Sequence, residues 1–274
     1  MKSPREIAQS SERQLEQLAW LAEDDPKGAL AELARLAESE IYPFAFSAVA
    51  AGWAKVDPVA ASKWVEGIES EDFGVSALFG LIPVWGSVDP QMALNWALKV
   101  DKRTLRDVAL VELASVWGSY DSVEVFKKYR SLPEESAVLD GLHAITSDWA
   151  LRDPKSAIRY LSSLELEQDR DRFLEMGLVS LTNQNPLMAW RESGRIANVK
   201  LQEHVKCMAL EALAEENPEA AINLAETIDR SDDMALAIAR GWSFEDAEGA
   251  KQWVETIDVE NLRNKAFRVI REED

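Results

Sequence analysis

The side chains that most often carry catalysis are scarce in this chain of 274 residues. It contains two histidines, His143 and His204, and a single cysteine, Cys207. The histidines are far apart in sequence, and neither belongs to a His-Glu-x-x-His stretch, which places two zinc ligands one helical turn apart. Cys207 lies in an apolar segment, where a thiol packs as a small hydrophobic group. We therefore interpret all three as structural residues.

Acidic side chains are abundant, and some stand close enough in sequence to suggest a calcium site or a pair of glycosidase carboxylates. The nearest groupings are Glu69, Glu71 and Asp72, and the pair Asp169 and Asp171. We expect them in connections between helices, and they lack the glycine-containing spacing of a calcium loop. Neither a Gly-x-Ser-x-Gly elbow nor a phosphate-binding loop occurs. The sequence therefore predicts solvated charges, no catalytic residue, no bound metal and no cofactor.

Tryptophan is also abundant, with 10 in the chain. Four of them, Trp53, Trp85, Trp117 and Trp149, follow one another at steps of 32 residues. Such a series has two interpretations: a groove of aromatic rings that holds an extended ligand, or rings that pack between helices. We favour packing, because large aromatic side chains at regular helical spacing usually belong to a core.

Charge restricts the class of partner. Lys and Arg number 30 and Asp and Glu number 49, which gives a formal net charge of −19. Non-specific affinity for nucleic acids comes from Lys and Arg that neutralise phosphates, so we expect no nucleic-acid binding. The longest uncharged stretch, residues 73–88, is too short to span a membrane, and we expect no membrane insertion. A protein or peptide segment that is neutral or basic is the expected partner.

The compartment follows only in outline. One cysteine allows no intramolecular disulfide, and the polar segment Met1–Ser10 lacks the apolar core of a signal peptide. We expect a cytoplasmic protein. A periplasmic or secreted protein whose signal has been removed is the alternative.

The elements that position all these residues are set by a repeat of 32 residues. Its mark is an Asp or Asn, most often followed by Pro, which we call the anchor of each repeat. Asp or Asn is a good N-cap, and Pro at the next position loses no hydrogen bond because its missing N–H would be unpaired there. Each anchor therefore predicts the start of a helix. The anchors are Asp25, Asp57, Asp89, Asp121, Asp153, Asn185, Asn217 and, after a shorter step of 29, Asp246.

Two helices per repeat follow from the pattern around the anchor. The positions four and eleven residues after it are apolar, the position seven residues after it is often aromatic, and all three share one stripe, which predicts a short amphipathic helix. The segment before it is apolar on more than one face and carries Trp or Leu four residues before the anchor, which predicts a helix covered on most sides. Residues 1–24 supply the opening helix. Residues 258–271 predict a closing helix with Leu262, Ala266, Phe267 and Ile270 on one face.

The segments Asp153–Leu164 and Asn217–Ala225 resemble the second half of a tetratricopeptide repeat, in which a small residue and an aromatic residue stand four and seven residues into the helix. The period here is 32 rather than 34, and the tryptophan stands near the end of the first helix. The resemblance implies an all-α fold: one right-handed α/α superhelix (solenoid) over 1–274, of about eight helix pairs plus a C-terminal capping helix.

The role that the resemblance implies is a non-enzymatic scaffold or adaptor that mediates protein–protein interaction, because stacked helix pairs make an extended binding surface. The alternative is an α/α superhelical enzyme or a carbohydrate-binding protein that uses groove carboxylates and tryptophans. A structural spacer within a larger assembly is a third possibility.

Overall fold

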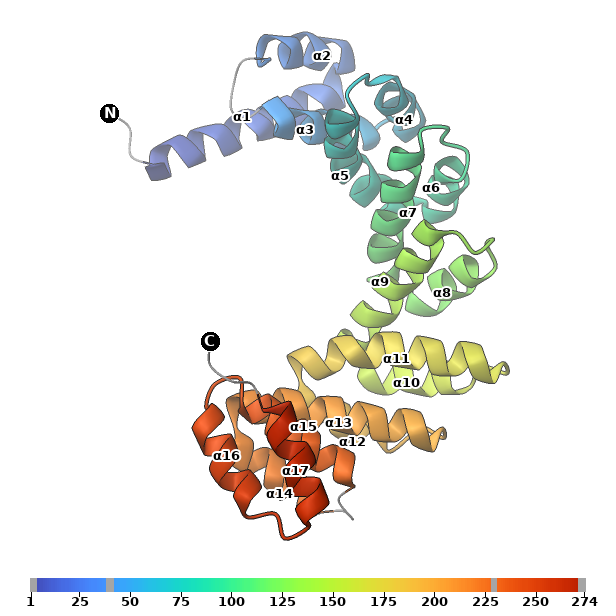
Figure 1. Cartoon of the computed structure of the whole chain (residues 1–274). Coiled ribbons are helices and arrows are strands. Elements are labelled where there is room, and N and C mark those ends of the chain that lie inside the picture. Colours follow the sequence, from blue (N-terminus) through green and yellow to red (C-terminus); the bar gives the residue numbers. More distant parts are fainter. Residues whose placement is uncertain (1–3, 38–41, 228–230, 271–274) are drawn as a thin grey trace. The chain divides into compact units, whose positions relative to one another are not determined.

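A computed structural model describes residues 4–37, 42–227 and 231–270 (Figure 1). Within these ranges every regular element is a helix and none is a strand, so the expected all-α fold is confirmed. The chain divides into two compact units, residues 1–145 (unit 1) and residues 146–274 (unit 2). Helix α9 crosses the boundary between them.

Longer and shorter helices alternate along the chain. The helices before the anchors, called the long helices, are α1 Pro4–Asp24, α3 Tyr42–Ala54, α5 Glu71–Val88, α7 Arg103–Gly118, α9 Ser136–Arg152, α11 Glu167–Gln184, α13 Val199–Glu216 and α15 Asp232–Trp242. The helices after the anchors, called the short helices, are α2 Pro26–Arg35, α4 Pro58–Gly67, α6 Pro90–Ala97, α8 Ser122–Arg130, α10 Pro154–Ser162, α12 Pro186–Ser193, α14 Pro218–Glu226 and α16 Ala247–Glu255. Helix α17, Glu260–Val269, comes last.

A single residue joins the long helix to its short helix in five of the eight pairs; three residues join α3 to α4 and α7 to α8, and four join α15 to α16. At the third anchor, the N–H of Asp89 donates to the carbonyl of Trp85 at 2.8 Å and so completes α5. The Asp89 carboxylate accepts from the N–H of Met92 at 2.9 Å and so caps α6. Each anchor is the N-cap of its short helix, and all except Asp25 accept a hydrogen bond through the side chain from the backbone three residues on. An Asp or Asn therefore ends one helix and begins the next.

The position four residues after the anchor is at the centre of the packing. A small or branched side chain there lies one turn into the short helix and faces the long helix. All eight are completely buried: Ala29, Ala61, Ala93, Val125, Ala157, Ala189, Ala221 and Ala250. Small residues at this position let the two helices of each pair approach closely.

In unit 1, each of α1, α3 and α5 contacts the next long helix, and each of α3, α5 and α7 contacts the short helices on either side of it. The short helices α4, α6 and α8 lie along one side of the row formed by α3, α5 and α7 (Figure 1). Glycine permits the closest crossings. A Cβ on Gly52 would lie 2.0 Å from the carbonyl oxygen of Ala19, and one on Gly80 would lie 2.0 Å from that of Ser47. No larger residue fits these crossings without displacing a backbone.

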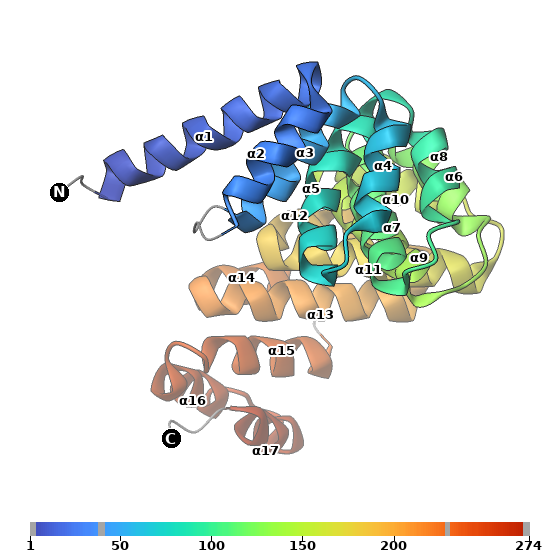
Figure 2. The ribbon, with the colours of Figure 1, turned by 90° about the horizontal axis from the view of Figure 1, so that it is seen from above.

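Unit 2 repeats this arrangement, with α13 and α15 side by side (Figure 2). A Cβ on Gly241 of α15 would lie 2.0 Å from the carbonyl oxygen of Glu211 on α13. Helix α15 begins 14 residues before its anchor, whereas α13 begins 18 before, so this long helix accounts for the shorter last step of the repeat.

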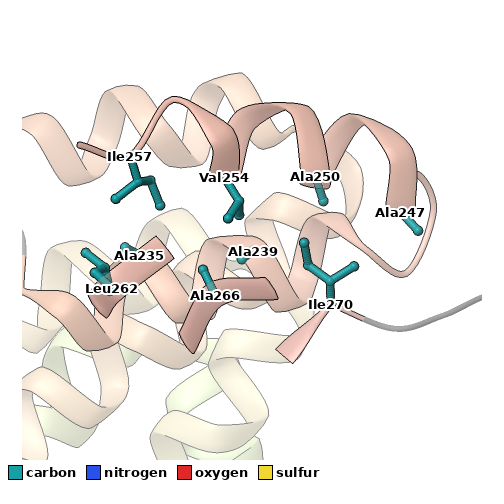
Figure 3. Close-up of a cluster of buried hydrophobic side chains, with 9 residues drawn as sticks. All are labelled: Ala235, Ala239, Ala247, Ala250, Val254, Ile257, Leu262, Ala266 and Ile270. Atoms are coloured by element: carbon teal, nitrogen blue, oxygen red, sulfur yellow. The ribbon is translucent and has the colours of Figure 1, made fainter. Parts of the chain in front are cut away.

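Helix α17 closes unit 2 by packing on α15 and α16 (Figure 3). Leu262, Ala266 and Ile270 are buried in this cluster together with Val254 and Ile257, as expected for the closing helix. Phe267 departs from the predicted face and is 38% exposed. It directly follows Ala266, so its side chain points about 100° away around the helix.

Candidate functional site

The four predicted tryptophans do not form an open groove. Trp85, Trp117 and Trp149 are buried, with at most 4% of each exposed, and Trp53 is half-buried. Three of them lie against the aromatic residue seven positions after the same anchor. The ring centroids are 6.0 Å apart for Trp53 and Trp64, 5.5 Å for Trp85 and Trp96, and 5.3 Å for Trp149 and Tyr160. These indoles join the long helix of a pair to its short helix.

Glu69 lies in the connection between α4 and α5, as expected, but the other acidic residues of the two groupings lie in helices. Glu71 and Asp72 are in the first turn of α5, and Asp169 and Asp171 lie near the start of α11, rather than in connections. The physical reason is that carboxylates are stabilised near a helix N-terminus by its partial positive charge. No group of three potential metal ligands is found among the described residues.

A face of the long helices that the short helices do not cover is the better candidate. It consists of the residues six, ten and thirteen positions before each anchor. Equivalent positions of neighbouring long helices lie close together, as one polar contact shows. Arg240 and Glu211, each six before its anchor, are joined at 2.7 Å. We call this surface the long-helix face.

In unit 1 the long-helix face carries no charge on α3, α5 and α7. Phe44 and Phe79 project from it with 64% and 52% of their surface exposed. Small and branched side chains make up the rest: Ser47, Ala51, Ser76, Pro83, Val108, Val111 and Ser115.

In unit 2 the same face is charged and hollowed. One cavity of about 400 Å³ lies between α13 and α15, and another of about 450 Å³ lies between the end of α11 and α13. They share Met208 and Glu211, and we call them together the α13 groove. The first is lined by Lys200, Glu203, His204, Cys207, Met208, Glu211, Asp233, Leu236, Ala237 and Arg240. The second is lined by Asn183, Gln184, Pro186, Met208, Glu211, Ala212, Glu215 and Glu216.

The α13 groove brings together two residues that the sequence analysis weighed separately. His204 and Cys207 are three residues apart on α13 and therefore share one side of the helix. Burial is the main cause that raises the pKa of the Cys207 thiol to about 11. Three neighbouring carboxylates act in the same direction, and the guanidinium of Arg240 opposes them. A thiol with this pKa is protonated at neutral pH and is a poor nucleophile.

The net charge of the α13 groove is negative. Five carboxylates and two cationic side chains line it, and one of those cations, Arg240, is already paired with Glu211. Glu215 and Glu216 are exposed in the last turn of α13, where no basic residue accompanies them. Two adjacent acidic residues at a helix C-terminus are unusual, because their charge is repelled by the partial negative charge there. This pair was therefore visible in the sequence as a sign of the site.

In the described part of the chain, no helix is both long and apolar enough to cross a membrane. Comparisons with protein-family models, with curated proteins and with solved structures give no match to this chain.

Proposed function

We propose that the chain is a non-enzymatic scaffold that binds protein segments on the long-helix face. In this proposal the helix pairs form one right-handed superhelical solenoid of about eight repeats over residues 1–274, and α17 caps its end. The alternation of long and short helices supports this architecture, as do the contacts between successive helices from α1 to α8 and from α10 to α17.

The observation that carries the proposal is a contrast between packing positions and face positions. Four residues after the anchor, every repeat has Ala or Val, all completely buried. Ten residues before the anchor, the repeats differ in size, polarity and charge, as Phe79, Glu175 and Cys207 illustrate. Packing explains why the first position stays constant. Packing does not require the residues ten positions before the anchor to differ between repeats. Such differences are what recognition of a particular partner needs.

The charge of the protein favours neutral or basic partners. A net charge of −19 attracts basic segments at long range, and that attraction weakens as salt screens it. We therefore expect faster association and tighter binding at low ionic strength.

The test is selection from a library of random 12-residue peptides displayed on phage, panned against the whole chain. We expect enriched peptides that share a pattern and, once synthesised, bind in solution. A chain with Phe79→Glu and Cys207→Glu, which changes the face in both units, should enrich a different set. Failure to enrich any peptide at low salt would overturn the proposal, as would identical sets from both proteins.

A further inference from the structure

We infer that the α13 groove takes a protein segment that carries a lysine or arginine beside an apolar side chain. This rests on the proposed function and assigns its partner and place. The cation enters the cavity at the ends of α11 and α13, and the apolar side chain enters the neighbouring cavity between α13 and α15.

The first support is an unfavourable arrangement of charge at the end of α13. Glu215 and Glu216 are adjacent like charges at the negative end of the helix dipole. Neither forms an ion pair within the described residues. Helix α11, which ends at the same cavity, also has no basic residue in its last turn. A cation from outside the chain would relieve this repulsion.

The second support is that the chain compensates an equivalent arrangement in unit 1. Asp24 and Glu23 stand one and two residues before their anchor, as Glu216 and Glu215 do. There, Lys55 from the next long helix donates to Glu23 at 3.0 Å, and both line one cavity. The residue equivalent to Lys55 after α13 is Phe244, two positions before Asp246. Unit 1 thus shows that an ammonium group can satisfy acidic residues at the end of a long helix, and in unit 2 the corresponding residue, Phe244, supplies none.

The third support is the character of the cavity beside it. Met208, Leu236 and Ala237 give the first cavity apolar surface between its charged residues, among them Lys200, Glu203 and Asp233, and the protonated Cys207 adds no charge. Glu211 is held by Arg240, so it separates the two cavities without offering a free carboxylate. The two cavities adjoin and share Met208, so one segment could place an apolar side chain in the first cavity and a cation beside Glu215 and Glu216 in the second.

The test uses the whole chain and a labelled, end-capped peptide of eight residues that alternates lysine and leucine. Fluorescence anisotropy measures its binding at about 50 mM salt, where surface charges are weakly screened. Matched peptides alternate glutamate with leucine and lysine with serine. We expect the lysine–leucine peptide to bind at least tenfold more tightly than either. Equal binding of lysine–leucine and lysine–serine would overturn the apolar half of the inference.

The decisive variant is Glu215→Gln with Glu216→Gln. It should weaken binding of the lysine–leucine peptide about tenfold and should not lower the melting temperature, because it removes a repulsion. The matched control is Glu248→Gln with Glu255→Gln, which makes the same charge change on α16 and should alter binding less than twofold. Phe244→Lys supplies the missing lysine and should also weaken binding. Equal effects of the two double variants would show general charge attraction and overturn the site.

Two further outcomes separate this inference from the proposed function. If phage-selected peptides bind and the Glu215→Gln, Glu216→Gln variant leaves them unaffected, the scaffold stands and the α13 groove is the wrong place. If no peptide binds, both fail. A melting-temperature rise with calcium alone that this variant abolishes would assign the carboxylates to a metal instead and overturn the basic segment.

Discussion

Helix pairs α5–α6 in unit 1 and α13–α14 in unit 2 share one turn and differ in what they pack on it. Asp89 and Asn217 accept from backbone N–H groups at 2.9 and 3.0 Å in the same geometry. Around Asp89, Trp85 lies against Trp96, whose indole N–H reaches Glu66 of the preceding short helix at 2.7 Å. Around Asn217, the corresponding residues are Leu213, which is buried in a hydrophobic cluster, and Leu224, which packs against that cluster.

The difference teaches which features define the pair and which only strengthen it. Where the long helix has Leu181 in place of Trp, the short helix has no aromatic partner either, but Glu192, buried and paired with Arg195 at 2.7 Å. Trp117 is the exception, because Lys128 occupies the partner position. The turn and the small residue after it are therefore constant, and the ring contact is an addition. The α13 groove adjoins two pairs that lack the ring contact, α11–α12 and α13–α14, and the pair α15–α16, which has it between Trp242 and Trp253.

The largest expected effect comes from removing the contact between the two aromatic rings of a pair. Trp85→Ala should lower the free energy of unfolding by about 3–5 kcal/mol, because it empties a buried site and leaves Trp96 without its partner. Trp85→Phe should cost much less, because the indole N–H of Trp85 makes no hydrogen bond among the described residues. Chemical denaturation monitored by circular dichroism measures both. A cost below about 1 kcal/mol for Trp85→Ala would show that the ring contact contributes little.

The next largest effect tests whether the close crossing of neighbouring long helices contributes to stability. Gly80→Ala places a Cβ within 2.0 Å of the Ser47 carbonyl and must push α3 and α5 apart. We expect a loss of about 1–3 kcal/mol. Gly67→Ala on α4 is the control, because nothing lies within 4 Å of its added Cβ. It should be neutral or stabilise by up to about 1 kcal/mol. Thermal melts of the two variants that coincide would contradict the close crossing.

The smallest effect concerns the capping hydrogen bond at the turn. Its loss should lower the free energy of unfolding equally in α5–α6 and in α13–α14. Asp89→Ala and Asn217→Ala should each cost about 0.5–2 kcal/mol, because each removes one capping hydrogen bond. Asp89→Asn should behave like the wild type. Asp25→Ala should cost less than either, since the Asp25 side chain makes no capping hydrogen bond. Unequal costs at Asp89 and Asn217, measured in the same denaturant series, would mean that the turn depends on the rings around it.

The local part of this fold could be predicted because its signals are local. An Asp or Asn before Pro fixes a helix start through neighbouring backbone groups, so the sequence predicts where each short helix begins. The aromatic pairs were missed because their two members belong to different helices, four before and seven after the anchor. Joining them requires knowing that the turn between the two helices is short enough to fold them back on each other.

The candidate site could not be predicted residue by residue for a related reason. Composition predicted an acidic protein, but the α13 groove depends on which residues neighbouring repeats bring together, as Glu211 and Arg240 do across 29 positions. The available signal was a pair of acidic residues where a helix ends. It could be recognised only after the helix end was known, since Glu215-Glu216 in a loop would be ordinary solvated charge.

The one-residue turn at Asp89 also limits where the chain can gain or lose residues. A residue inserted beside Asp89 would rotate α6 by about 100° relative to α5 and carry Ala93 out of the core. The connections from short to long helices carry no such constraint and already differ, with three residues between α4 and α5 and five between α6 and α7. Insertions and deletions should therefore accumulate in those connections. Duplication or grafting should succeed only when the exchanged piece runs from one turn to the next.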